Sequence, residues 1–487
     1  MSGLSRRWWM AAAMAGLAAV SCVPKRVHWS PDGQQAIVLA GENVFVTDAD
    51  GKLSGPFPAA LEQVSWRPDS RGFVAVRQEE LSTWEQVARV LSPEQDSRLM
   101  ELEEPFRKEV FAHEGSWDGW RPEMAKELSA PELLALWIYA REHDAEKLRD
   151  KLGDHWKEAA KWKLTVRCIQ LGEVEAGQMK LGPVLERHLD EIGPGSLLVS
   201  PDGQRAAYAV KDVGGPAEAK GGSDIGGSLR VRDLAEGAEL RLAAKFAAWR
   251  FGWTADGRYL VYATTKTGPA VDGLVLGEIK RLEVADKRGK IREPAFPEAD
   301  SLAGILYFPD TKIVCLKDGR ILFSAAPVQL PASTNDMPQG VSLFAIDPER
   351  QATVTPLITR EAQAHQPDDG FGKGLFEVRP GGTDVTMLNI EQGTVGVYTL
   401  ATGGLDIIMD SKPEDKKALA EVPSWRTGDE LSLVVPPGHE WGSAKRAELV
   451  LYSLREKKGR CISQKWPDEL MNLWGENKPK PAPTQPE

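Results

Sequence analysis

The feature that most constrains this chain is a short phrase that returns along it. Residues 26–51 read RVHWSPDGQQAIVLAGENVFVTDADG, and the phrase recurs as VSWRPDSRGFVAV, LLVSPDGQRAAYAV and FGWTADGRYLVYATT. Pro in the turn fixes φ, Asp accepts backbone N–H groups beyond itself, and Gly relieves the tight end. The alternating apolar residues that follow are typical of a half-buried strand. Each phrase therefore predicts a β-hairpin, with a third strand after it, as at 43–48.

The phrases align on one position, two residues before the turn Pro or its substitute. The residues there, which we call the blade anchors, are Trp29, Trp66, Val199, Trp253, Tyr307, Val378 and Trp425. Units of about four short strands cannot bury both faces alone, so seven of them predict a closed ring. The expected fold is an all-β propeller of about seven four-stranded blades. Six or eight blades stay open, because RPGG at 379–382 and RTGD at 426–429 depart most from the phrase.

One interval between anchors indicates an insertion. From position 66 to position 199 the chain runs about twice as far as in any other interval, and its third strand is displaced to KLTVRCIQLGE, from Lys163. Between them, residues 79–162 show helical spacing and alternating charges, and Ser129 with Glu132 forms a capping box. The expected organisation is a leader at 1–21, propeller at 22–78, an α-helical insertion in the second blade at 79–162, propeller at 163–466, and a disordered tail at 467–487.

The repeated S-P-D-G phrase, followed by an apolar strand and a strand that ends in Asp, resembles the TolB-type propeller repeat. The resemblance covers roughly residues 26–460 and implies fold more than function. Relatives in the prolyl-oligopeptidase group join such a propeller to a hydrolase domain whose nucleophile lies in G-x-S-x-G. This chain has no such pentapeptide, and only about 20 residues follow its last expected strand. A serine hydrolase is therefore not expected.

The beginning of the chain predicts export. Arg6 and Arg7 precede an apolar run from Trp8 to Val20, which is shorter than the about 20 residues of a membrane-spanning helix. The end of this run, Ala19-Val20-Ser21-Cys22, resembles a bacterial lipobox, which implies cleavage before Cys22 and a diacylglyceryl group on it. Cleavage by ordinary signal peptidase stays open, as does twin-arginine export, because SRRWW resembles that signal. Val23 after the cysteine favours the outer membrane, on its periplasmic side.

Few residues in the sequence are candidates for a metal or cofactor site. Seven histidines lie without metal-ligand spacing, and Cys168, Cys315 and Cys461 are scattered singly, so we expect no metal site and no cofactor. A net charge of −11 makes nucleic acid an unexpected partner. The anchors Trp29, Trp66, Trp253 and Trp425 are expected to wedge between blades, the alternative being an aromatic lining at one end of the channel.

The insertion offers the expected surface for a partner. Trp117 and Trp120 lie in a stretch without helical period, and Glu101, Glu103 and Glu104 lie on one helix. Insertions on a rigid scaffold often carry function. We therefore expect a lipid-anchored, non-enzymatic scaffold of the cell envelope that binds an envelope protein. The alternative is a sugar- or peptide-binding protein, or an enzyme, that uses the propeller channel.

Overall fold

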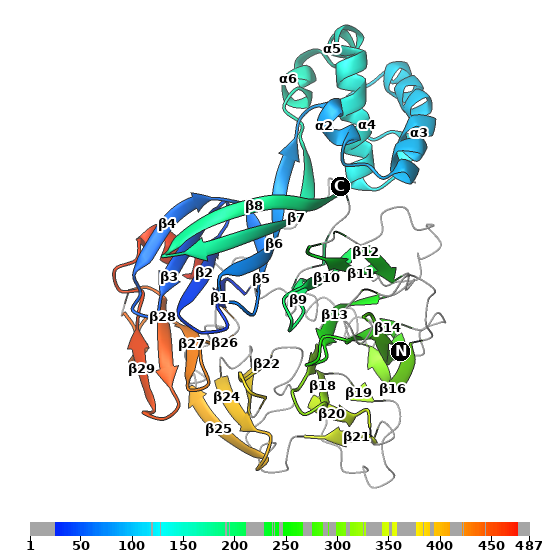
Figure 1. The fold of residues 1–487 in the computed structure, drawn as a ribbon. Helices are drawn as coiled ribbons and strands as arrows, with labels where there is room; N and C mark the ends of the chain where they lie inside the picture. The colour runs from blue at the N-terminus through cyan, green and yellow to red at the C-terminus, as the bar shows by residue number, and fades with distance from the viewer. Residues whose placement is uncertain are drawn as a thin grey trace, which may run out of the picture.

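The computed structural model confirms an all-β propeller with a helical insertion (Figure 1). It describes residues 25–117, 120–126, 128–189, 192–193, 195–210, 228–235, 237, 239–242, 247–265, 275–285, 291, 299–307, 312–324, 326–327, 343–349, 353–357, 376–382, 384–389, 394–409, 421, 423–443 and 445–475. The expected leader at 1–21 and the lipidation site Cys22 lie outside these residues.

Seven antiparallel sheets, or blades, follow one another along the described chain. Blade 1 holds β1 (Val27–Trp29), β2 (Gln35–Ala40), β3 (Asn43–Asp48) and β4 (Leu53–Pro58). Blade 2 holds β5 (Leu61–Trp66), β6 (Gly72–Leu81), β7 (Leu164–Glu175) and β8 (Gln178–His188). Blade 3 holds β9 (Leu198–Val199), β10 (Arg205–Val210), β11 (Ser228–Asp233) and β12 (Glu239–Leu242). Blade 4 holds β13 (Ala247–Trp253), β14 (Tyr259–Thr265), β15 (Val275–Glu283) and β16 (Asp300–Tyr307), and β19 (Ala326–Pro327) pairs with β16. Blade 5 holds β17 (Ile313–Cys315), β18 (Ile321–Ser324), β20 (Leu343–Asp347) and β21 (Thr353–Pro356). Blade 6 holds β22 (Phe376–Val378), β23 (Asp384–Asn389), β24 (Thr394–Thr399) and β25 (Gly404–Met409). Blade 7 holds β26 (Ser424–Trp425), β27 (Glu430–Val435), β28 (Glu448–Ser453) and β29 (Lys458–Cys461).

The expectation that Tyr307 is a blade anchor was wrong. Tyr307 ends β16, the fourth strand of blade 4, where it pairs with Val275. The inner strand of blade 5 is β17, and Cys315 holds the anchor position before the turn Leu316-Lys317-Asp318-Gly319. That turn keeps the Asp-Gly pair but lacks Ser and Pro, so the Pro-Asp pair after Tyr307 gave the better sequence match.

The turns after the inner strands need glycine for two reasons. Gly33 has φ of +67°, a conformation that L side chains rarely adopt. A Cβ on Gly33 would also lie 2.5 Å from the carbonyl oxygen of Arg426, in the equivalent turn of blade 7. Gly203, Gly257 and Gly382 likewise have positive φ and face the turn of the preceding blade. The repeated glycine therefore lets neighbouring turns pack against one another around the axis.

The ring closes between blade 7 and blade 1 without a shared strand. Val27, Trp29 and Val38 of blade 1 pack with Leu449 and Leu451 of blade 7 in one buried cluster. Trp466 and the following helix α8 (Asp468–Gly475) complete the cluster with the side chains of Leu470 and Met471. The expectation of a disordered tail from residue 467 was thus wrong for 468–475, which form a helix that covers the seam between blades 7 and 1. Residues 476–487 lie outside the described part.

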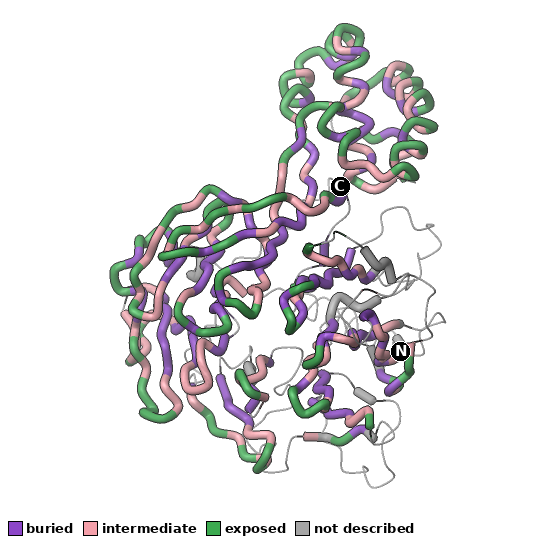
Figure 2. The backbone as a smooth tube through the Cα atoms, in the orientation of Figure 1, coloured by how far each residue is buried: buried purple, intermediate pink, exposed green. Residues whose placement is uncertain are grey.

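The insertion stands on the extended ends of β6 and β7, apart from the ring (Figure 1). Its described helices are α2 (Trp84–Ala88), α3 (Pro93–Ala112), the 3-10 turn η1 (Glu123–Lys126), α4 (Ala130–His143), α5 (Ala145–Leu152), the 3-10 turn η2 (Gly153–His155) and α6 (Trp156–Ala159). Their buried side chains form one core with Leu81, Leu164 and Val166 of the two strands, and Figure 2 shows exposed residues around its outside. Strand β6 ends at Leu81, so it takes up the first three residues of the range 79–162 expected for the insertion.

The two ends of the ring differ. Inner strands begin at one end, which we call the mouth, and reach their turns at the other, which we call the turn end. Because β6 is antiparallel to β5, Arg77 lies opposite Leu61 at the start of β5, and β6 continues to Leu81 beyond it. The insertion therefore projects from the mouth end. Among the described residues, no helix combines the length and the apolar character needed to span a membrane.

Candidate functional site at the mouth of the ring

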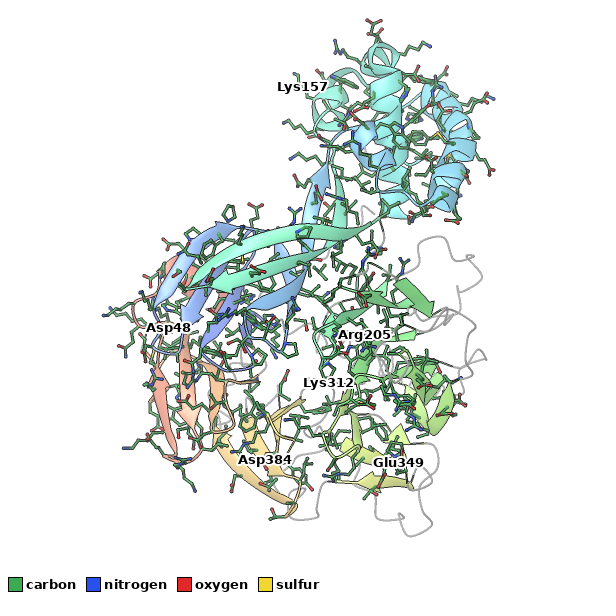
Figure 3. The ribbon with its side chains drawn as sticks, viewed as in Figure 1. Asp48, Lys157, Arg205, Lys312, Glu349 and Asp384 are labelled. Carbon is green, nitrogen blue, oxygen red and sulfur yellow. The ribbon has the colours of Figure 1, made fainter. Side chains whose placement is uncertain are left out.

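Three charged side chains from three blades meet at the mouth. Lys25 precedes β1, Lys312 precedes β17 and Glu377 lies in β22. The Oε1 atom of Glu377 lies 3.0 Å from Nζ of Lys25 and 3.4 Å from Nζ of Lys312. We call these three residues the axial cluster, and Figure 3 shows Lys312 near the middle of the ring, away from Glu349 at its edge. The inner strands and the residues just before them thus bring ionic groups together at the mouth.

The cluster is fixed by the strands that carry it. Lys312 also donates to the carbonyl oxygen of Phe376, and its ammonium lies 5.2 Å from the centre of the Phe376 ring. The backbone carbonyl of Glu377 accepts from Nε1 of Trp425 at 3.4 Å. The side chains of Lys25, Lys312 and Glu377 are 35%, 25% and 24% exposed, so solvent reaches all three. The cluster is therefore a preorganised ionic site that a solute can approach.

Two further groups place the first strand. Glu421, before β26, is buried and accepts the backbone N–H groups of Arg26 and Val27 at 2.8 and 2.7 Å. Nε2 of His28 lies 3.0 Å from the carbonyl oxygen of Lys25. These contacts hold the backbone of Lys25, Arg26 and Val27 in place. They therefore fix the position from which the Lys25 side chain extends.

The protonation states follow from the surroundings. Burial alone would raise the pKa of Glu377, but the charges of Lys25 and Lys312 and their hydrogen bonds lower that pKa to about 2. Burial, followed by the charge of Lys25, lowers the pKa of His28 to about 3. At neutral pH the site thus holds one carboxylate and two lysines beside a neutral imidazole. Within the axial cluster two ammonium groups face one carboxylate, and ammonium groups bind anionic groups through charge-assisted hydrogen bonds.

The structure places the aromatic anchors between blades. Trp66 donates through Nε1 to the carbonyl of His28 at 2.8 Å, and Trp253 donates to that of Leu198 at 3.2 Å. Trp425 makes the same contact with the carbonyl of Glu377. In all three cases the indole N–H donates to the carbonyl of the residue just before the anchor of the preceding blade. An arginine of the preceding blade lies over three of these rings, in the pairs Arg205–Trp253, Arg379–Trp425 and Arg426–Trp29. These contacts describe wedges between blades rather than an aromatic lining.

The expected partner surface of the insertion is dispersed. Trp117 and Trp120 are half-buried against the core of the insertion, and Nε1 of Trp117 donates to the carbonyl of Lys151 at 3.2 Å. Glu103 pairs with Arg107 at 2.7 Å and Glu104 with Lys108 at 2.8 Å, while Glu101 is exposed on the same helix. A role of these five residues in partner binding stays a prediction.

The sequence did not reveal the axial cluster. Lys25 and Glu377 are 352 residues apart, and their contact depends on the closure of the ring. A signal was nevertheless present: Lys25, Lys312 and Glu377 all lie within four residues before an anchor position, once Cys315 replaces Tyr307 as the anchor of blade 5. The three cysteines described by the structure, Cys168, Cys315 and Cys461, are free thiols.

Similarity to known proteins is found among solved structures. No protein-family model matches the chain, and no curated protein matches it. A puromycin hydrolase structure matches with a TM-score of 0.47 and 13% identity over 92% of this chain, which spans 54% of the hydrolase chain. An oligogalacturonate lyase in complex with manganese matches with a TM-score of 0.37 and 10% identity over 78% of this chain and 75% of the lyase. A putative TolB from Agrobacterium tumefaciens matches with a TM-score of 0.35 and 12% identity over 58% of this chain and 84% of that protein.

Those structures correct two expectations. The interpretation of the chain as a non-enzymatic scaffold, and the prediction that it is not an enzyme, were wrong: the solved structures similar to this chain include hydrolases, prolyl endopeptidases and a lyase. The absence of a G-x-S-x-G pentapeptide bears on one kind of hydrolase alone, and the sequence did not reveal the charged groups that meet in the axial cluster.

Proposed function

We propose that the mouth of the propeller binds a small ligand that carries an anionic group, such as an acidic sugar or the carboxylate end of a peptide. The observation that carries this proposal is the convergence of Lys25 and Lys312, from two blades that are not neighbours, on one solvent-accessible carboxylate. A ligand carboxylate would share or replace Glu377 as the acceptor of the two ammonium groups. Mouths and channels of β-structured rings are frequent ligand sites.

A binding panel with a matched lysine control tests the proposal. Uronic-acid oligosaccharides and short peptides, with neutral sugars and C-terminally amidated peptides as controls, are titrated by calorimetry into the chain from residue 22 onward. We expect a carboxylated probe to bind and Lys312→Met to weaken its binding at least about tenfold, or roughly 1.4 kcal/mol. Lys52→Met serves as the control, because Lys52 is exposed in the turn between β3 and β4.

The outcomes separate binding from catalysis. If every carboxylated probe fails to bind, or if folded Lys312→Met binds as the parent does, the proposed site is wrong. Mass spectrometry of the incubated probes then reports turnover: a product that depends on Lys312 identifies an enzyme, and an unchanged probe identifies a binding protein.

We further propose that the chain is exported and carries a diacylglyceryl group on Cys22, on the periplasmic side of the outer membrane. Arg6, Arg7, the apolar run from Trp8 to Val20 and the small residues before Cys22 support this proposal. Contact with another envelope protein belongs to the same proposal. Mass spectrometry of the N-terminal peptide from native cells tests the lipid directly.

A further inference from the structure

We propose that the anchored chain holds the mouth of its ring, with the axial cluster, toward the membrane that carries its lipid. This inference rests on the lipid at Cys22 proposed above and adds an orientation to it. The interaction surface is the mouth end, and its partner is the surface of the bilayer. A ligand would then reach Lys25, Lys312 and Glu377 from the side of the membrane.

The first step is that Lys25 is fixed at the mouth. Its ammonium bonds Glu377 of blade 6 at 3.0 Å, and the next two backbone N–H groups bond the buried Glu421 of blade 7. Strand β1 follows directly and pairs with β2 in the register Val27–Val38. The chain therefore enters the ring at the mouth and at no other place.

The second step is the reach of the tether. Three residue steps separate Cys22 from Lys25. A fully extended chain covers at most about 3.6 Å per residue, so the lipidated residue lies within roughly 11 Å of Lys25. The six-residue strand β2 alone spans about 20 Å from the turn end to the mouth. A lipid on Cys22 can therefore hold the mouth at the bilayer surface but cannot hold the turn end there.

The third step concerns the insertion, which projects from the same end of the ring. Strand β6 continues four residues past Arg77, or about 13 Å, before the helices begin. Because the helices begin farther from the mouth than the tether reaches, the axis of the ring must be tilted for the mouth to be held at the bilayer, with the helices of the insertion beside the mouth. The mouth and the insertion then form one membrane-facing side, and the ring of glycine turns faces away.

Energy transfer between labels and lipid tests the orientation on the full lipidated chain. Donor dyes are attached to Glu42→Cys, in the exposed turn between β2 and β3 at the mouth, or to Gln34→Cys, exposed at the turn end of the same blade. Cys168, Cys315 and Cys461 are replaced by alanine in both. The proteins are reconstituted into phosphatidylcholine vesicles that contain an acceptor-labelled lipid. We expect at least twofold greater transfer from position 42 than from position 34.

A lengthened tether is the matched control. Twenty Gly and Ser residues inserted between Pro24 and Lys25 reach roughly 25 Å on average, so the difference between the two positions should shrink. Mass spectrometry is recorded first. If the N-terminal peptide carries no diacylglyceryl group, the anchor and the orientation both fall. If the lipid is present but position 34 transfers as well as position 42, the orientation is overturned and the anchor stands.

Discussion

At the scale of single residues, one tryptophan position shows how the blades are joined. Trp66 and Trp29 hold the same place in neighbouring blades, and each is wedged beside the preceding blade. Nε1 of Trp66 donates to the carbonyl of His28, whereas the buried Nε1 of Trp29 has no hydrogen-bond partner among the residues that the structure describes. A comparison of the two sites therefore separates the contribution of the indole hydrogen bond from that of indole packing.

This difference predicts unequal costs for the same substitution. Trp66→Phe should lower the free energy of unfolding by about 1 kcal/mol more than Trp29→Phe, because only the first loses a hydrogen bond. Trp29→Phe also removes a buried donor without a partner, which offsets part of its lost packing. Urea denaturation of both variants measures the difference. Equal losses would mean that the Trp66 bond contributes nothing to joining the blades.

At the scale of elements, helix α8 completes the closure of the ring. Trp466, Leu470 and Met471 are each less than 5% exposed, and Nε1 of Trp466 donates to the carbonyl of Gly51 in blade 1 at 2.9 Å. Large apolar side chains contribute about 1.5–3 kcal/mol each when buried. Trp466 and the helix after it thus link the last blade to the first through side chains.

Truncation separates this helix from the segment after it. Removal of residues 466–487 should cost about 5 kcal/mol of stability, since it uncovers the seam between blades 1 and 7. Removal of residues 476–487 alone leaves α8 and should leave the thermal midpoint unchanged. Differential scanning calorimetry of the two truncated chains decides the matter. Equal midpoints for both truncated chains would show that α8 does not stabilise the closed ring.

The same elements show what the sequence can predict. Blades 1, 2 and 3 were readable because Ser, Pro, Asp and Gly recur at turns that all pack against a neighbouring turn, and the insertion was readable from a displaced third strand. Helix α8 was missed because its few apolar residues acquire a partner only when blade 1 returns to it. Lys25, Lys312 and Glu377 were missed for the same reason, as their contact exists only in the closed ring.

At the scale of the whole molecule, no strand is shared between blade 7 and blade 1, so closure of the ring depends on contacts of side chains with one another and with the backbone. Arg426 of blade 7 bonds the carbonyl of Gly33, and Arg460 bonds that of Ala49 at 3.1 Å. Glu377 adds a link across the axis, because its carboxylate joins blade 6 to both blade 1 and blade 5. The stability of the closed ring should therefore depend on the charge of the Glu377 carboxylate.

Acid is the means to test that link. The pKa of Glu377 is lowered from 4.5 to about 2 in the folded chain, so its contribution to stability is complete above about pH 4.5 and is lost as the pH falls toward 2. Glu377→Gln should accordingly melt below the parent chain at pH 6, and this gap should close by about pH 2. His28, whose pKa is lowered to about 3, also makes both proteins sensitive to acid, and its share differs between them because the charge of Glu377 raises the pKa of His28. Glu85→Gln is the control, because the exposed pair of Glu85 with Arg89 contributes little at either pH. A gap between parent and Glu377→Gln that persisted unchanged at pH 2 would show that the shape of the side chain, rather than its charge, holds the three blades together.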